Sequence, residues 1–157
     1  MKDINIVIDE NERKDIATGL SRLLADSYTL YLQTQNFHWN VTGPMFEPLH
    51  LMFGEQYTEL AEAVDLIAER IRTLGFAAPA TFSDFKELSS IKETRENMNS
   101  SKMIETLLDS QETILRLLRI VSADAAKAHD EGTYDILIQR TKVHEKNAWM
   151  LRSSLSL

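Results

Sequence analysis

The stretch NFHWNVTGPMFEPLHLMF, residues 36–53, decides the fold, because one helix ends and the next begins within it. Gly43 permits a positive φ and Pro44 cannot continue a helix, so the chain turns at this point. Apolar residues on both sides of the turn recur at spacings of three, four or seven, which is typical of amphipathic helices. The pattern predicts one helix over about 11–40 and a second over about 46–74, which ends with Gly75 in the C′ position.

The same periodicity predicts two more long helices, over about 101–129 and 134–152. The DEGT stretch separates them, and Thr133 can cap the last helix. Between the second and third long helices lies a long connection, residues 76–100. It is expected to hold one short helix around SDFKELSS, capped by Ser83 or Asp84. This order predicts an all-α four-helix bundle with a crossover, in which the second and third long helices run parallel.

Length and composition favour one domain over residues 1–157, with a short N-terminal tail at 1–10. The absence of cysteine fits a reducing compartment and excludes thiolate chemistry, zinc fingers and iron–sulfur clusters. The sequence contains no run of about 18 apolar residues, which a membrane span would need, and the N-terminus has no signal-peptide core. We therefore expect a cytoplasmic protein that does not bind a membrane.

The net charge of −7 disfavours binding to nucleic acid, which usually needs a basic patch or tail. The first fifteen residues hold three basic and five acidic side chains, so DNA binding through this tail is disfavoured. An acidic shell suits cations better.

Four residues are candidate metal ligands: His38 and His50 on either side of the turn, and Asp65 and Glu69 one helical turn apart. Two imidazoles with two carboxylates suit Fe(II), whereas Mg²⁺ or Ca²⁺ would need more oxygen ligands. Catalytic zinc could also use this set. Simpler interpretations stay open, because a histidine on an apolar stripe is often a core residue and an acid pair on a helix is often solvated.

His50 and Asp65 lie fifteen residues apart on one predicted helix, which separates their Cα atoms by about 22 Å. No side chain spans that distance, so one chain would hold two half-sites. A two-fold dimer with antiparallel helices would bring the histidines of one chain to the acids of the other. Small residues on the same shoulder of the helix, Gly54, Ala61 and Ala68, would let a second helix approach closely.

Nearly the whole chain resembles the Dps-like mini-ferritins, through NFHWNVTGPMFEPLH, AVDLIAERIRTLG and VHEKNAWMLRS. The shared features are the His-Trp pair, the twelve-residue step from His38 to His50, and acids fifteen and nineteen residues beyond His50.

The resemblance implies a ferritin-like bundle with a short helix in the crossover, assembled into a hollow homododecamer built from two-fold dimers. It implies ferroxidase activity, in which Fe(II) is oxidised to Fe(III), preferably by hydrogen peroxide, and ferric mineral is stored inside the shell. Such a protein stores iron and protects against oxidative damage. His38 and His50 from one subunit, with Asp65 and Glu69 from its neighbour, match the iron ligands.

The resemblance also implies roles for several further residues. Trp39 lies beside the iron centre in this family, as a packed aromatic or as an electron donor. Members often have an acid where this chain has Gly54, so a second iron would bind weakly or through Glu62. Three acids, Asp130, Glu131 and Asp135, resemble those that line the family's pores, although acids at a helix N-terminus also offset the helix dipole.

Three other residues are expected to have structural roles: His144 in the core, His129 at the surface and Trp149 in packing. An alternative function is a nucleoid-type DNA-binding protein with little ferroxidase activity. A third possibility is an inert helical oligomer.

Overall fold

The computed structural model describes residues 4–93 and 97–155, and this part of the chain folds into five α-helices without a strand. Their bounds are α1 Glu10–Asn40, α2 Phe46–Thr73, α3 Phe82–Leu88, α4 Ser100–Lys127 and α5 Glu131–Ser154. The predicted four-helix bundle, with a short helix in a long crossover, is confirmed.

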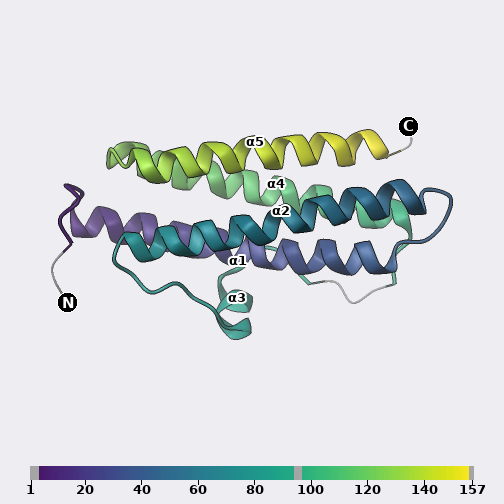
Figure 1. Ribbon diagram of the computed structural model, residues 1–157, viewed down its shortest axis with the longest axis horizontal. Helices are drawn as coiled ribbons and strands as arrows, with labels where there is room; N and C mark the ends of the chain where they lie inside the picture. Colours follow the sequence, from purple (N-terminus) through teal and green to yellow (C-terminus); the bar gives the residue numbers. More distant parts are fainter. Residues whose placement is uncertain (1–3, 94–96, 156–157) are drawn as a thin grey trace.

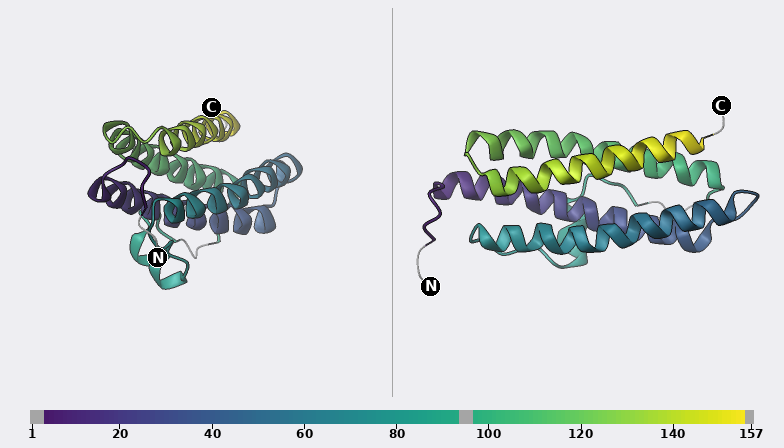
Figure 2. Two further views of the ribbon diagram at one scale, coloured as in Figure 1. Left: turned by 60° about the vertical axis from the view of Figure 1, so that its left-hand side comes forward. Right: turned by 45° about the horizontal axis from the view of Figure 1, so that its top comes forward.

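Figure 1 shows α1 and α2 as one antiparallel pair and α4 and α5 as the other. The connection that carries α3 returns along the outside of α1, so that α2 and α4 run in the same direction, as predicted. Figure 2 shows the two pairs stacked on one another, with α3 on the side of α1 and α2 that faces away from α4 and α5. Consequently the crossover covers part of the outer side of α1.

The turn between α1 and α2 is built as the sequence predicts. Gly43 has a φ of +104°, and its carbonyl accepts a hydrogen bond from the amide of Phe46 at 3.0 Å. Gly75, with a φ of +100°, ends α2 in the predicted position directly after the C-cap Leu74. The carbonyl of Leu74 is satisfied by the buried guanidinium of Arg13, at 2.7 Å.

The predicted N-caps of α3 and α5 are wrong. Thr81, in extended conformation, caps α3 by accepting from the amide of Asp84. Asp130 caps α5 by accepting from the amide of Thr133, which is therefore the third residue of the helix. The chain reverses at His129, whose φ of +52° breaks the helix earlier than the apolar pattern indicated.

The core lies between the two helix pairs and consists mainly of leucine and isoleucine side chains from all four long helices. Where α1 crosses α4, Gly19 lies against Val121, and a Cβ at Gly19 would come within 2.8 Å of the valine Cγ2. Within the described residues, no helix is long and apolar enough to cross a membrane.

A buried carboxylate in the middle of α1 holds the crossover. One oxygen of Asp26 accepts hydrogen bonds from the Ser89 hydroxyl at 2.8 Å and the Ser90 amide at 2.6 Å, directly after α3. Its other oxygen has no partner among the described residues. Burial raises the pKa of Asp26, while the hydrogen bonds from Ser89 and Ser90 oppose that shift. Asp26 thus fixes α3 against the outside of α1.

We expect Asp26→Ala to lower the melting temperature, because it removes the acceptor of the Ser90 amide and the nearer acceptor of the Ser89 hydroxyl, whose other acceptor, the Ile91 carbonyl, lies at 3.4 Å. A hydrogen bond to a charged group contributes about 1.5–3 kcal/mol. Asp26→Asn retains an acceptor oxygen and removes the buried charge, so it should lose much less. Thermal unfolding of both variants at neutral pH measures the difference. Equal losses would show that the acceptor oxygen does not hold the crossover.

Candidate metal centre

The two histidines predicted as ligands lie against each other across the α1–α2 turn. His38 is in the last turn of α1 and His50 in the second turn of α2, and both are half-buried. Their rings stack with centroids 3.8 Å apart and planes 14° apart. The turn at Gly43 therefore brings together two residues that are twelve positions apart.

Reciprocal hydrogen bonds fix the orientation of both rings. His38 Nδ1 lies 2.7 Å from the carbonyl oxygen of His50, and His50 Nδ1 lies 2.8 Å from the carbonyl oxygen of His38. A carbonyl only accepts, so each Nδ1 carries the proton, and in the neutral ring Nε2 keeps its lone pair. A histidine that donates from one nitrogen to a carbonyl is oriented to bind a metal through the other.

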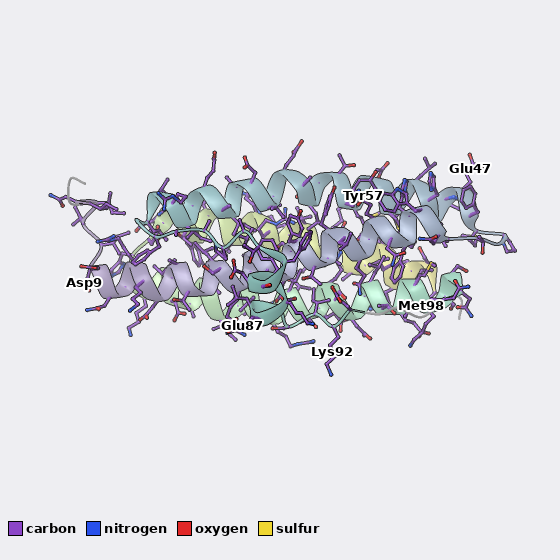
Figure 3. The ribbon with its side chains drawn as sticks, turned by 90° about the horizontal axis from the view of Figure 1, so that it is seen from below. Asp9, Glu47, Tyr57, Glu87, Lys92 and Met98 are labelled. Atoms are coloured by element: carbon purple, nitrogen blue, oxygen red, sulfur yellow. The ribbon has the colours of Figure 1, made fainter. Side chains whose placement is uncertain are left out.

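The two rings line a shallow, open cavity along α2. Three glutamates line it as well, Glu55, Glu59 and the predicted candidate Glu62, together with Tyr57. Figure 3 shows Tyr57 where α2 runs along α1, in the same half of the molecule as Glu47 at the start of α2. The cavity combines imidazole and carboxylate donors, which is the set that Fe(II) accepts.

The predicted acids lie apart from this cavity. Asp65 and Glu69 are exposed farther along α2, and neither forms an ion pair with the described residues. Over residues 4–93 and 97–155, no three histidine, aspartate or glutamate side chains come close enough to hold one metal ion. The chain thus holds the histidines and the acids as separate groups, and the site shared between two chains stays a prediction.

Gly54 has a steric role that the sequence did not reveal. A Cβ at this position would lie 3.0 Å from Cε1 and 3.2 Å from Nδ1 of His38. The ring cannot easily retreat, because it stacks on His50 and is bonded to its carbonyl. A side chain at residue 54 would therefore disturb the histidine pair.

The histidines have two aromatic neighbours that the sequence pattern did not reveal: Phe46, whose ring stacks on that of His50 with centroids 5.1 Å apart, and Tyr57. Its ring meets that of His38 edge-on, with centroids 5.1 Å apart. Tyr57 follows His50 by seven residues, a spacing that places both on one face of a helix and could have identified it. Trp39, in contrast, is 64% exposed and does not line the cavity. Its interpretation as a core aromatic is wrong for the single chain.

A buried polar network connects the cavity wall to the bundle core. Arg140 of α5 forms a two-pronged ion pair with Glu59 and donates to Nε2 of His144 at 3.1 Å. His144 Nδ1 in turn donates to Gln111 Oε1 at 2.6 Å. The fully buried His144 confirms the prediction of a core histidine, and burial, with the charge of Arg140, lowers its pKa well below the ordinary value.

The three predicted pore acids separate into two groups. Asp130 is buried, caps α5 and forms an ion pair with Arg70 of α2 at 2.7 Å. Its carboxylate is thus engaged by partners inside the chain, and its place in a pore stays a prediction. Glu131 and Asp135 are exposed near the N-terminus of α5 and remain candidates.

The predictions for the other two residues with structural roles, His129 and Trp149, have different outcomes. His129 is exposed, as predicted. Trp149 is 61% exposed on α5, so its prediction as a packing residue is wrong within one chain. Its position on the helix places the ring outside the apolar stripe.

The buried His144 predicts a specific loss of stability in acid. An unfolded chain binds a proton at this histidine near the ordinary pKa of about 6.5, whereas the folded protein keeps the ring neutral. The stability contribution is full above that pH and is lost progressively below it. As the pH is lowered from about 7.5 to 5.5, the melting temperature of His144→Gln should therefore fall less than that of the wild type. Exposed His129→Asn is the control, and an unchanged pH profile in His144→Gln would contradict the assignment.

Comparison with known proteins places this geometry in a family. A ferritin-like domain model matches residues 17–157. A DNA protection during starvation protein of Bacillus anthracis is 38% identical over 143 residues, covering 91% of this chain and 98% of that protein. A low temperature-induced protein of Nostoc is 38% identical over 155 residues, covering 98% of this chain and 87% of that protein.

Solved structures agree. The Dps protein of Vibrio cholerae, described as a member of the ferritin-like diiron-carboxylate proteins, superposes with a TM-score of 0.93 at 30% identity over 99% of both chains. A Dps protein from Bacillus brevis superposes with a TM-score of 0.90 at 33% identity, over 99% of this chain and all of that one. With the stacked histidines and the crossover helix, these similarities show that the chain belongs to the ferritin-like family as a Dps-like mini-ferritin, a family assignment that indicates iron storage and protection from stress.

Proposed function

We propose that this protein is a ferroxidase that oxidises Fe(II), preferably with hydrogen peroxide, and stores the ferric product as mineral inside a homododecameric shell. The observation that supports it best is the stacked pair of histidines, each with Nδ1 held by a carbonyl and Nε2 left to bind a metal. Such a pair is arranged in advance for a metal ion, which is the substrate here.

The ligand set is completed by Asp65 and Glu69 from a second chain. Both acids are exposed, and Leu51 and Leu66 on the same helix are 58% and 45% exposed, an apolar surface that a partner helix would cover. In a two-fold dimer with antiparallel α2 helices, each end of the interface gains one pair of histidines and one pair of acids.

The chemistry requires two Fe(II) for each peroxide: 2 Fe²⁺ + H₂O₂ → 2 Fe³⁺ + 2 OH⁻. The imidazoles bind the reduced ion, and the hard carboxylate oxygens favour the oxidised one. Pairing the two electrons avoids hydroxyl radical, so one reaction both stores iron and protects the cell. Glu62 in the cavity is a further candidate ligand for the second ion.

Glu131 and Asp135 supply negative charge at a possible entry route. Both are exposed at the start of α5. When several copies meet around this helix end, their carboxylates create a negative potential that concentrates Fe(II).

The relatives include proteins named for DNA protection and one named for DNA binding. We do not propose DNA binding through the N-terminal tail, because its acidic side chains outnumber the basic ones and Asp9 is engaged in capping α1. Ferroxidase activity is therefore preferred over a nucleoid-type function.

Complementation between two inactive variants tests the shared site. We expect His38→Ala plus His50→Ala, and separately Asp65→Ala plus Glu69→Ala, to lose most peroxide-dependent Fe(II) oxidation. When the two double variants are unfolded together and refolded as a mixture, each mixed dimer contains one site with all four ligands. Random pairing should restore about a quarter of the wild-type sites. No recovery, with mixed dimers confirmed by mass spectrometry, would contradict a site shared between chains.

Gly54→Asp tests whether the glycine is a missing ligand or a steric requirement. We expect the new side chain to displace His38 and to weaken binding of the first metal ion, measured by titration with Co(II). Thr58→Asp, one turn farther along the same cavity, is the control, because it adds the same charge at a position that already carries a side chain. Tighter metal binding in Gly54→Asp would show that the site lacks a carboxylate and has room for it.

A further inference from the structure

A continuous series of aromatic rings leads away from the histidine pair. Tyr57 meets His38 with ring centroids 5.1 Å apart, Tyr31 meets Tyr57 at 5.8 Å, and Tyr28 meets Tyr31 at 5.9 Å. All three separations lie within the contact range of aromatic pairs, about 4.5–7 Å. Tyr28 in turn packs on Phe85 of α3 at 4.8 Å.

Three of the four tyrosines in the sequence belong to this series. Tyr57 lines the cavity beside the histidines, so its ring is next to the position where a bound metal would react. Tyr31 is half-buried, and its hydroxyl oxygen accepts a hydrogen bond from Gln35 at 3.2 Å. Tyr28 lines two cavities beside α3, neither of which includes the histidines. Phenylalanine would fill the same space, so packing alone does not require the three phenols.

We propose that Tyr57, Tyr31 and Tyr28 form a chain that accepts an oxidising equivalent at the metal site and moves it away along α1. The inference rests on the proposed function, because hydrogen peroxide and Fe(II) supply that equivalent.

The need for such a chain arises when peroxide meets a site that holds one Fe(II). Gly54 supplies no ligand, so the second ion depends on Glu62, the candidate in the same cavity. A single ion supplies one electron: Fe²⁺ + H₂O₂ → Fe³⁺ + OH⁻ + •OH. The radical lacks one electron and one proton, and both must come from the nearest oxidisable group.

Tyr57 supplies both. The hydroxyl radical takes a hydrogen atom from the phenol, so its O–H bond breaks and a new O–H bond forms in water: •OH + Tyr57–OH → H₂O + Tyr57–O•. An electron then passes from Tyr31 to the Tyr57 radical through the contact of their rings. Tyr57 regains its proton from water in the open cavity, and the half-buried Tyr31 releases its phenolic proton to solvent, which leaves the radical on Tyr31. A second transfer of the same kind leaves it on Tyr28, three contacts away from the metal ligands.

Tyr57→Phe tests the first step, because it keeps the ring and removes the hydrogen atom. Tyr134→Phe is the matched control, since Tyr134 is exposed on α5 and stands outside the series. Each assembled protein is loaded with one Fe(II) per site, mixed with excess peroxide and freeze-quenched. Tyrosyl radical is measured by electron paramagnetic resonance and escaping hydroxyl radical by a spin trap.

We expect the wild type and Tyr134→Phe to give the same tyrosyl signal and little trapped hydroxyl radical. Tyr57→Phe should lose the tyrosyl signal severalfold and release severalfold more trapped radical. Equal signals in Tyr57→Phe and the wild type would overturn the inference.

Tyr31→Phe tests the later step. Peptide mass spectrometry after repeated turnovers should find oxidation at Tyr28 reduced severalfold in this variant, with oxidation at Tyr57 increased. Unchanged oxidation at Tyr28 would overturn transfer along the series. The rate of Fe(II) loss in the wild type is followed in the same samples. Its absence would overturn the proposed function and the inference with it, whereas rapid Fe(II) loss with identical radical yields in all variants overturns the inference alone.

Discussion

The reciprocal pair of hydrogen bonds between His38 and His50 is the interaction on which the rest of the site depends. Each imidazole donates to the main chain of the other residue, so the same two bonds close the α1–α2 turn and choose the tautomer of both rings. Orientation of a metal-binding nitrogen usually needs a separate carboxylate or carbonyl partner. Here each ligand supplies that partner to the other, and Gly54 leaves space for the arrangement.

A second constraint comes from the stiffness of α2. A helix rises about 1.5 Å per residue, so the acids that could complete the ligand set cannot reach the histidines of their own chain. The interior of the bundle, meanwhile, is filled by the core and by the network of Arg140, His144 and Gln111. The cavity beside the histidines therefore lies at the surface, along α2.

Much of the fold could be predicted, because it depends on residue patterns within single helices and turns. The spacing of leucines and isoleucines located four long helices, and Gly43 and Gly75 marked the ends of the first two. The N-caps were harder, since Thr81 and Asp130 each compete with a similar residue two or three positions away.

Contacts between helices left weaker signals in the sequence. The histidine pair was predictable from its position at a turn, but the contact of Gly54 with His38 depends on side-chain packing across two helices. The pairing of Asp130 with Arg70 joins residues sixty positions apart, and no local pattern reports it. The packed interpretation of Trp149 and Trp39 failed within one chain for a different reason: a large aromatic on a helix is usually buried, and both are exposed here. The other interpretation of Trp39, as an electron donor, stays a prediction.

The separation of histidines and acids along α2 also has a thermodynamic consequence. A metal ion held by ligands from two chains binds the dimer and not the monomer. A higher concentration of the metal ion therefore shifts the association equilibrium toward the dimer by mass action. In the proposed dimer, iron would stabilise the association of the two chains and would also be the material that the shell stores. With less iron bound, the dimers that build the proposed shell would dissociate more readily.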